Sequence, residues 1–196
     1  MIKLGDKPIL HHTIEIYKKY GFKEFTSATG YKGEVIKKYF SKKFNDCSIS
    51  VINTGQQTMT GGRLLRLKRY FLNNENFMLT YGDGLTDQNL KKLFTYHLSH
   101  KKIGTITAVR PPARYGELKI VGKKVKQFDE KPIVTKSWIN GGFFVFNEKI
   151  FKYIKNDLNM LEREPFQKLT QKRELMAFKH FGFWQCMDTM RDKKIL

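Results

Sequence analysis

The sequence predicts an α/β protein with a Rossmann-like, mostly parallel sheet flanked by helices. The first observation is a regular alternation of helical and strand patterns over residues 1–110. The second is the apolar run Phe77-Met78-Leu79, which stops in the turn Tyr81-Gly82-Asp83-Gly84 before a helical pattern, as in the strand-turn-helix units of parallel sheets. The third is a change after Pro112 to short strands, which predict a small antiparallel portion.

Apolar spacing and turn residues define the elements of the first part. Pro8 suits the first turn of a helix that stops at Gly21. Thr86 is the expected N-cap of the helix after the Asp83 turn, and Leu90, Leu93 and His97 share its apolar face. The other predicted elements of this part are strands at 22–28, 47–52, 77–81 and 103–109, and helices at 35–40 and 60–71.

The second part contains a predicted hairpin, in which strands 118–121 and 125–128 are joined by a Gly122-Lys123 turn. The strand 138–146 contains two adjacent glycines, which predict a bulge or a surface that another group approaches closely. Helices begin near Lys149 and Pro165. Two further strands, at 175–180 and 183–186, complete the part, and the last of them leads to Asp188.

The chain length and composition indicate one globular domain. The 196 residues are enough for a substantial core, and 40% of them are hydrophobic. No apolar run approaches the length of a membrane span, and no signal segment opens the chain. Cys47 and Cys186 lack metal-ligand spacing. We therefore expect a soluble cytoplasmic protein.

The net charge of +19 favours anionic partners such as nucleotides, sugar phosphates or nucleic acid. However, the lysines are scattered along every segment, and no nucleic-acid-binding motif accompanies them. A compositional bias of the genome explains such scattering as well, so nucleic acid is the less favoured partner.

Asp83 and Asp188 each follow a predicted strand. If the two strands are neighbours, both carboxylates lie at one rim, and paired carboxylates with open positions are how Mg²⁺ is held against a polyphosphate. The alternative is that each aspartate caps the helix that follows it.

Two further segments carry candidate binding residues. Thr58 to Arg63 places a Gly-Gly turn at a helix N-terminus, where backbone amides suit an anion or a base edge, although a plain loop-to-helix turn is the commoner explanation. In Glu130-Lys131-Pro132 the lysine suits a phosphate and the glutamate suits sugar hydroxyls. A surface ion pair is the alternative there.

These segments together resemble, in order from about Gly5 to Asp192, the glucose-1-phosphate cytidylyltransferases, which are sugar-1-phosphate nucleotidyltransferases with a Rossmann-like core. The matching stretches are Gly-Asp-Lys-Pro-Ile-Leu, Gly-Tyr-Lys-Gly, Asn-Thr-Gly-Gln-Gln-Thr-Met-Thr-Gly-Gly-Arg, Leu-Thr-Tyr-Gly-Asp-Gly, Glu-Lys-Pro, Trp-Ile-Asn-Gly-Gly-Phe-Phe-Val and Gly-Phe-Trp-Gln-Cys-Met-Asp-Thr. The Trp-Ile-Asn-Gly-Gly and Met-Asp-Thr elements make the resemblance specific.

The resemblance implies transfer of CMP from CTP to glucose 1-phosphate, with release of pyrophosphate and no covalent enzyme intermediate. Residues 1–110 would then be the nucleotide-binding half of the single domain, and 111–196 its sugar-phosphate-binding half. By matched position, Asp83 and Asp188 would hold Mg²⁺ as catalytic residues together with Lys131. The implied nucleotide-binding residues are Thr58, Arg63 and Gly82, and the implied sugar-phosphate-binding residues are Gly116, Glu130, Lys131, Asn140, Gly141 and Trp184. A homo-oligomer remains open.

The sequence departs from this family at its start, because the usual strand and the Leu-Ala-Gly-Gly-x-Gly-Thr-Arg type of loop are absent. That loop is the family's main triphosphate cradle. The absent strand would be central, so we expect apolar surface and unpaired backbone where it belongs. Three hypotheses stay open: a cytidylyltransferase lacking its N-terminus, a non-catalytic relative that binds sugar phosphate or a partner subunit, and, far behind, a basic nucleic-acid-binding protein.

Overall fold

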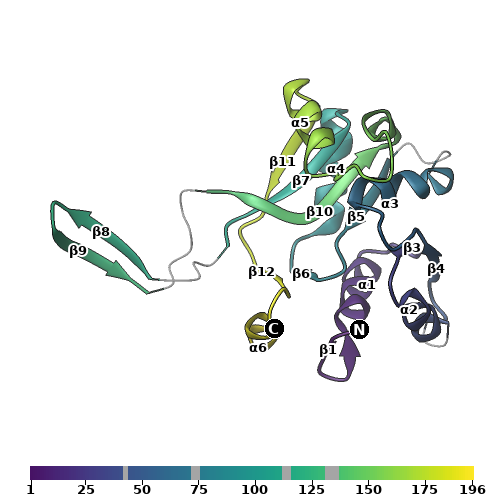
Figure 1. Cartoon of the computed structure of the whole chain (residues 1–196), viewed down its shortest axis with the longest axis horizontal. Coiled ribbons are helices and arrows are strands. Elements are labelled where there is room, and N and C mark those ends of the chain that lie inside the picture. The colour runs from purple at the N-terminus through teal and green to yellow at the C-terminus, as the bar shows by residue number, and fades with distance from the viewer. Residues whose placement is uncertain (42–43, 72–75, 112–115, 131–136) are drawn as a thin grey trace.

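The computed structural model describes residues 1–41, 44–71, 76–111, 116–130 and 137–196. Its main sheet has four strands in the order β11-β7-β10-β5. These strands are β5 (Asn76–Thr80), β7 (Gly104–Val109), β10 (Ile139–Asn147) and β11 (Leu175–Lys179). β11 is parallel to β7, whereas β10 is antiparallel to both of its neighbours, so β5, β7 and β11 point the same way. Their carboxyl ends therefore meet at one edge of the sheet, where β10 begins (Figure 1).

Six helices accompany these strands in the described part of the chain. They are α1 (Ile9–Lys19), α2 (Gly33–Phe40), α3 (Thr60–Arg66), α4 (Leu90–His100), α5 (Glu164–Gln171) and α6 (Met190–Ile195), with shorter 3-10 turns η1 (Lys68–Tyr70) and η2 (Glu148–Tyr153). Of these, α4 and α5 pack directly against the main sheet. None of the described helices is long and apolar enough to cross a lipid bilayer.

β10 divides the hydrophobic core into two layers, because successive side chains of a strand point to opposite faces. Phe143 and Val145 pack on one side against α4 and α1. Phe144 and Phe146 pack on the other side against α3, α5 and η2. All four of these side chains are fully buried, which explains the continuous apolar run in the sequence.

Shorter strand pairs lie outside the main sheet. β3 (Glu24–Thr29) and β4 (Ser48–Asn53) form a separate parallel pair, and β6 (Gly84–Thr86) and β12 (Trp184–Cys186) form an antiparallel one. β1 (Lys3–Leu4) pairs with β2 (Lys7–Pro8) ahead of α1. Among the described strands, β3, β4, β5 and β11 each have one hydrogen-bonded neighbour. The expected site of a missing central strand stays a prediction.

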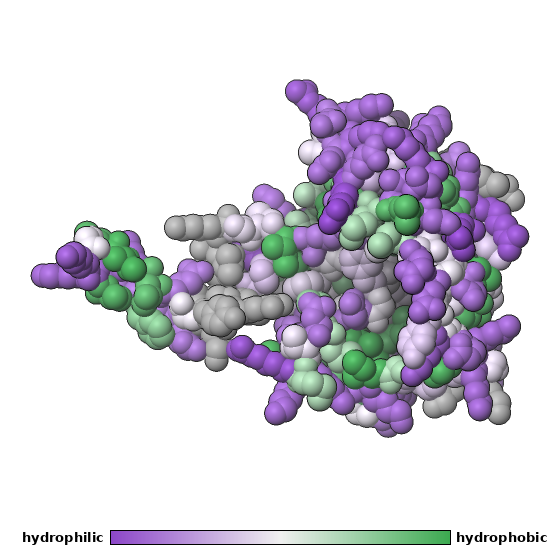
Figure 2. Space-filling model, viewed as in Figure 1, coloured by the Kyte–Doolittle hydropathy of each residue, from purple (hydrophilic) through white to green (hydrophobic). Residues whose placement is uncertain are grey.

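The predicted hairpin forms, and it stands clear of the rest of the molecule (Figure 1). Its strands are β8 (Glu117–Val121) and β9 (Lys124–Asp129), and every residue in them is exposed. Leu118 pairs with Phe128 and Ile120 with Val125, so these four apolar residues share one face. Figure 2 shows this face as a green patch on the projecting arm.

The predicted α/β class is confirmed, although the sheet is less parallel than expected. Two of the three pairings in the main sheet are antiparallel, because β10 lies between β5 and β7. The predicted N-cap Thr86 is wrong: this residue lies in β6, and the Asn89 side chain caps α4 by accepting a hydrogen bond from the Lys92 amide at 3.0 Å. The prediction missed β6 because its three residues are too short to show a periodic pattern.

Candidate active site

The candidate site lies at the edge of the main sheet where β5 ends and β10 begins. β5 stops at Thr80, and the turn that follows carries Gly82 and Asp83 into β6. Gly82 is exposed, and apart from its chain neighbours the one described residue that a Cβ atom at this position would touch is Leu10 of α1, at 3.4 Å. The turn therefore leaves open space around the half-buried Asp83 carboxylate.

The structure brings Asp83 and Asp188 together through the antiparallel ladder between β6 and β12. The Met187 amide donates to the Asp83 carbonyl at 2.9 Å, which fixes the residue before Asp188 next to the Asp83 turn. Burial raises the pKa of the Asp83 carboxyl above its usual range, and the charge of Asp188 raises it further. The charge of Asp188 therefore acts on the Asp83 carboxyl. The sequence analysis expected this if the strands before the two aspartates were neighbours, but among the described strands β5 pairs with β10, and it is the unpredicted β6 that pairs with β12.

Asp188 does not cap the helix that follows it, so that alternative is wrong. Thr189 is the N-cap of α6, and its hydroxyl accepts from the Asp192 amide at 3.2 Å. Asp192 completes a capping box by accepting from the Thr189 amide at 2.8 Å. The exposed Asp188 carboxylate is therefore not consumed by helix capping.

Cys186 lies against this acidic pair. Its thiol donates to Asp188 Oδ2 at 3.3 Å. Burial, this hydrogen bond and the charges of Asp188, Asp192 and Asp83 raise the pKa of the Cys186 thiol to about 12. At pH 8 a thiol with that pKa is ~10⁻⁴ ionised, so Cys186 is a poor nucleophile.

This arrangement predicts how fast Cys186 reacts with iodoacetamide at pH 8. Alkylation of Cys186 in the unmodified chain should be very slow, and Asp188→Asn should accelerate it about tenfold for each unit by which the pKa falls. Mass spectrometry of the alkylated peptides measures the rate. Asp129→Asn, on the exposed hairpin, is the matched control and should leave the rate unchanged. Equal rates in both variants would mean that Asp188 does not face the thiol.

The paired glycines of β10 form the predicted bulge, where the register with β7 shifts between Asn140 and Phe144. Gly142 has φ +73°, and a Cβ atom there would come within 2.9 Å of the Tyr81 ring. The Gly142 carbonyl accepts from the Tyr81 amide at 3.2 Å. The Trp184 indole donates to the Gly141 carbonyl at 2.7 Å. The bulge therefore ties β10 to the Asp83 turn on one side and to β12 on the other.

A polar network that the sequence analysis missed supports this bulge. The Tyr81 hydroxyl donates to Glu162 Oε1 and also interacts with the Asn140 side chain. Glu162 Oε2 accepts from the Thr60 hydroxyl at 2.7 Å. Burial raises the pKa of Tyr81, and Glu162 adds to the shift, so the phenol stays protonated. Glu162 lies in no distinctive motif, so only its contacts reveal it.

Arg63 joins the carboxyl ends of β3 and β4. Its guanidinium donates to the Thr29 carbonyl at 3.0 Å and to the Thr54 hydroxyl at 2.8 Å. Thr58 is buried, and its hydroxyl lies 2.7 Å from where a Cβ atom of Gly55 would be. Thr58 and Arg63, two of the three predicted nucleotide-binding residues, thus lie beside the loops that follow this parallel pair.

The glycines that open α3 have a packing role. The Gly62 amide donates to the Asn159 carbonyl at 3.2 Å, and the preceding Met59 amide donates to the Asp157 carbonyl at 2.9 Å. A Cβ atom on Gly62 would lie 2.4 Å from the Asp157 carbonyl oxygen. The amides of Met59 and Gly62 are therefore bound to carbonyl groups of the protein and not directed at an anion, in agreement with the loop-to-helix explanation of the Gly-Gly pair.

The structure does not bring the hairpin residues to this site. Gly116 and Glu130 lie together at the base of the hairpin, where a Cβ atom on Gly116 would be 3.1 Å from Glu130 Oε2. The hairpin projects away from the sheet edge that carries Asn140 and Gly141 (Figure 1). Lys131 falls outside the described residues. The sugar-phosphate roles of these hairpin residues stay predictions.

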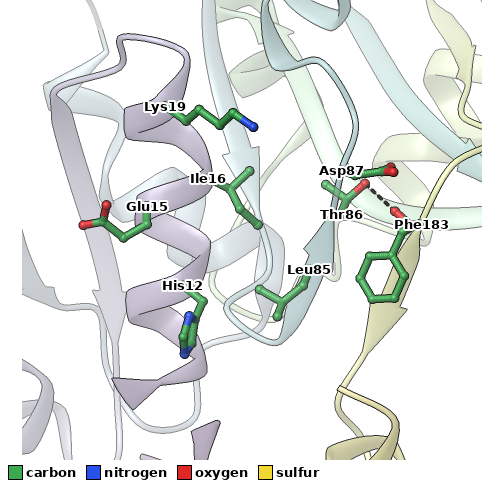
Figure 3. A pocket seen from close by; sticks show the side chains of 8 residues that line it. All are labelled: His12, Glu15, Ile16, Lys19, Leu85, Thr86, Asp87 and Phe183. Carbon is green, nitrogen blue, oxygen red and sulfur yellow. Dashed lines mark hydrogen bonds between the residues drawn. The ribbon is translucent and has the colours of Figure 1, made fainter. Parts of the chain in front are cut away.

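Two cavities are found among the described residues. One, of about 480 Å³, is lined by residues that follow β3 and β4, including Gly30, Lys32 and Gly55. The other, of about 420 Å³, lies between α1 and β6 and contains none of the predicted site residues. Figure 3 shows Ile16 and Leu85 facing each other across it, with Phe183 near β12. Within the described residues no group of three or more His, Cys, Asp or Glu is arranged to hold a metal.

Comparison of the whole chain with known proteins identifies its relatives. The glucose-1-phosphate cytidylyltransferase of Salmonella typhi is 41% identical over 218 aligned residues, which cover 100% of this chain and 85% of that protein. The probable glucose-1-phosphate cytidylyltransferase of Bacillus subtilis is 38% identical over 211 residues, covering 96% and 82%.

Solved structures show the same fold. The crystal structure of HddC from Yersinia pseudotuberculosis superposes with a TM-score of 0.79 at 21% identity, covering 100% of this chain and 86% of that chain. A UDP-glucose pyrophosphorylase complexed with UDP-glucose gives a TM-score of 0.73 at 15% identity, covering 98% and 86%. The nucleotidyl transferase family profile matches residues 1–185. The chain therefore belongs to the nucleotidyl transferase family, and its sequence relatives there include glucose-1-phosphate cytidylyltransferases.

Proposed function

We propose that this protein transfers a cytidylyl group from CTP to glucose 1-phosphate, forming CDP-glucose and pyrophosphate in a Mg²⁺-dependent reaction. The observation that carries the proposal is the convergence of Asp83 and Asp188 at the end of β5, in a chain 41% identical to a glucose-1-phosphate cytidylyltransferase. We also propose a cytoplasmic location, in keeping with the reaction's soluble substrates.

The donor set at this edge fits Mg²⁺. Asp83 and Asp188 offer carboxylate oxygens, which this ion prefers, and one or two carboxylates suffice because Mg²⁺ keeps several waters. The negative charge of Asp188 contributes to the raised pKa of Asp83. A cation bound between the two carboxylates would relieve this repulsion. Bound there, Mg²⁺ would neutralise and orient the phosphates of the nucleotide.

The remaining residues hold the acceptor in line with the nucleotide. A phosphate oxygen of glucose 1-phosphate forms a bond to the α-phosphorus of CTP, while pyrophosphate departs with the electrons of the broken bond. In this proposal Asn140 and the Gly141 backbone line the acceptor pocket. Trp184 and the Tyr81–Glu162 pair keep the bulge in position. Positioning of this kind is the main protein contribution when no covalent intermediate forms.

A non-catalytic role of the 196-residue chain is the second candidate, because these residues include no Gly-Gly-x-Gly-Thr-Arg segment to cradle the triphosphate. In that case the chain would bind sugar phosphate or pair with another subunit without turnover.

Pyrophosphate release separates these candidates. The purified chain is assayed with CTP, glucose 1-phosphate and Mg²⁺, beside a version extended upstream with a family-type strand and glycine-rich loop. We expect turnover in the extended chain and little or none in the 196-residue chain. Turnover in the short chain would mean that another group holds the triphosphate. No turnover in either would favour the non-catalytic role.

A further inference from the structure

Two cations meet on one tryptophan at the same sheet edge as the candidate site. The Arg110 guanidinium carbon lies 4.5 Å from the Trp138 ring centroid, and Lys179 Nζ lies 5.5 Å from it. The Phe181 ring meets Trp138 edge-on at 5.3 Å. Arg110 Nε is buried, and it has no hydrogen-bond partner among the described residues.

Strand register places this cluster beside Asn140. Ala108 of β7 is opposite Asn140 of β10 on one side and opposite Lys179 of β11 on the other. The outermost pair of the ladder between β7 and β10 is Val109 with Ile139, so Arg110 and Trp138 lie one residue beyond it. Because successive side chains of a strand point to opposite faces, Arg110 and Trp138 lie on the same face as Ala108 and Asn140. The four polar or aromatic side chains therefore form one continuous surface from the candidate acceptor pocket outward.

The cluster is electrostatically incomplete by itself. A single cation is stabilised over an aromatic face, but two like charges at one ring repel each other. A buried donor without a partner adds a further cost. Lys172 over Tyr153, at 5.4 Å, is an example of the simpler arrangement with one cation. An anion with several acceptor oxygens would satisfy both the charge and the donors.

We propose that Arg110, Lys179 and Trp138 form a subsite for a phosphate group, and that this is the phosphate of the sugar 1-phosphate acceptor. The assignment to the acceptor rests on the proposed function. Its position next to Asn140 and at the carboxyl ends of β7 and β11 supports it. Arg110 and Lys179 would bind the phosphate oxygens, and Trp138 would hold the two side chains in place.

Tryptophan fluorescence tests this proposal without requiring turnover. The 196-residue chain is titrated with glucose 1-phosphate, glucose and pyrophosphate, and Trp138→Phe identifies the part of the signal that comes from Trp138 and not Trp184. We expect glucose 1-phosphate to change the Trp138 emission and glucose to have no effect. Arg110→Gln and Lys179→Gln should each weaken glucose 1-phosphate binding about tenfold. Arg110→Lys should recover part of the loss.

Lys172→Gln is the matched control, because it removes a cation from a ring at the opposite end of β11. Its binding should stay within about twofold of the unmodified chain. Melting temperatures show whether each variant is folded. Equal weakening in Lys172→Gln, or no weakening in the two test variants, would overturn the subsite. A response to pyrophosphate alone would overturn its assignment to the acceptor.

These experiments distinguish a failure of the proposed function from a failure of the phosphate subsite. Binding that depends on Arg110 and Lys179, without pyrophosphate release in any form of the chain, would keep the subsite and reject the catalytic proposal. Turnover with unchanged glucose 1-phosphate binding in both variants would do the reverse.

Discussion

Asp83→Asn is expected to abolish pyrophosphate release in the extended chain while leaving the fold intact. The substitution replaces one of the two carboxylates proposed to hold Mg²⁺ with an amide. Loss of this ligand removes Mg²⁺, whose positive charge would neutralise the polyphosphate. Asp46→Asn, which alters an exposed carboxylate paired with Lys18, is the matched control and should keep full activity. Full activity in Asp83→Asn would remove Asp83 from the metal site.

The same substitution should raise the free energy of unfolding at neutral pH. The pKa of Asp83 is raised in the folded protein, chiefly by burial, so ionisation of this carboxyl favours the unfolded chain. At pH values below the ordinary pKa of 3.8, this carboxyl is protonated in both the folded and the unfolded chain and leaves the free energy of unfolding unchanged. The free energy of unfolding falls as the pH rises through the raised pKa of the folded protein. The amide of the Asp83→Asn variant carries no charge, so the advantage of the variant should grow between about pH 4 and pH 7.

Urea denaturation at these two pH values measures the difference. A variant that loses stability relative to the parent as pH rises would show that the Asp83 carboxylate is stabilised in the fold. Mg²⁺ provides an independent measurement, because it should raise the melting temperature of the parent and not that of Asp83→Asn.

Phe144→Ala should produce the largest loss of stability, about 3–5 kcal/mol in free energy of unfolding. The Phe144 side chain is fully buried, and the centroid of its ring lies 5.5 Å from that of Phe146 and 5.6 Å from that of Phe166. The surrounding rings come from β10 and α5, so the cavity cannot close by a small local movement. Urea denaturation at constant pH gives the value.

Phe128→Ala is the control for this prediction, since the same side chain is removed from the exposed hairpin. Phe128 is 60% exposed and packs on no part of the main core that the structure describes. Its loss should change the free energy of unfolding by no more than about 0.5 kcal/mol. A large effect at Phe128 would show that the apolar face of the hairpin is covered in solution.

Phe144 also connects the core to the candidate site. Its ring meets the Tyr81 ring edge-on at 5.4 Å, and Tyr81 binds Glu162. Removal of Phe144 should therefore loosen the β10 bulge as well as the core.

The sequence alone predicted most of the helices and strands, the bulge at Gly141-Gly142 and the position of Asp83 after a strand, but not the short strands β1, β2 and β6. These features depend on local spacing, on apolar periodicity and on the conformational freedom of glycine. The resemblance carried by the Trp-Ile-Asn-Gly-Gly and Met-Asp-Thr elements is likewise a property of the sequence, and the chain does belong to that family.

Only the tertiary structure decided which of these residues meet. Asp83 and Asp188 lie far apart in the chain, and the short ladder between β6 and β12 brings them together. Glu162 enters the site from a separate loop, and Arg110 and Lys179 meet at Trp138 through the register of three strands. Strand pairing between distant segments depends on the packing of the whole core, which local periodicity does not encode.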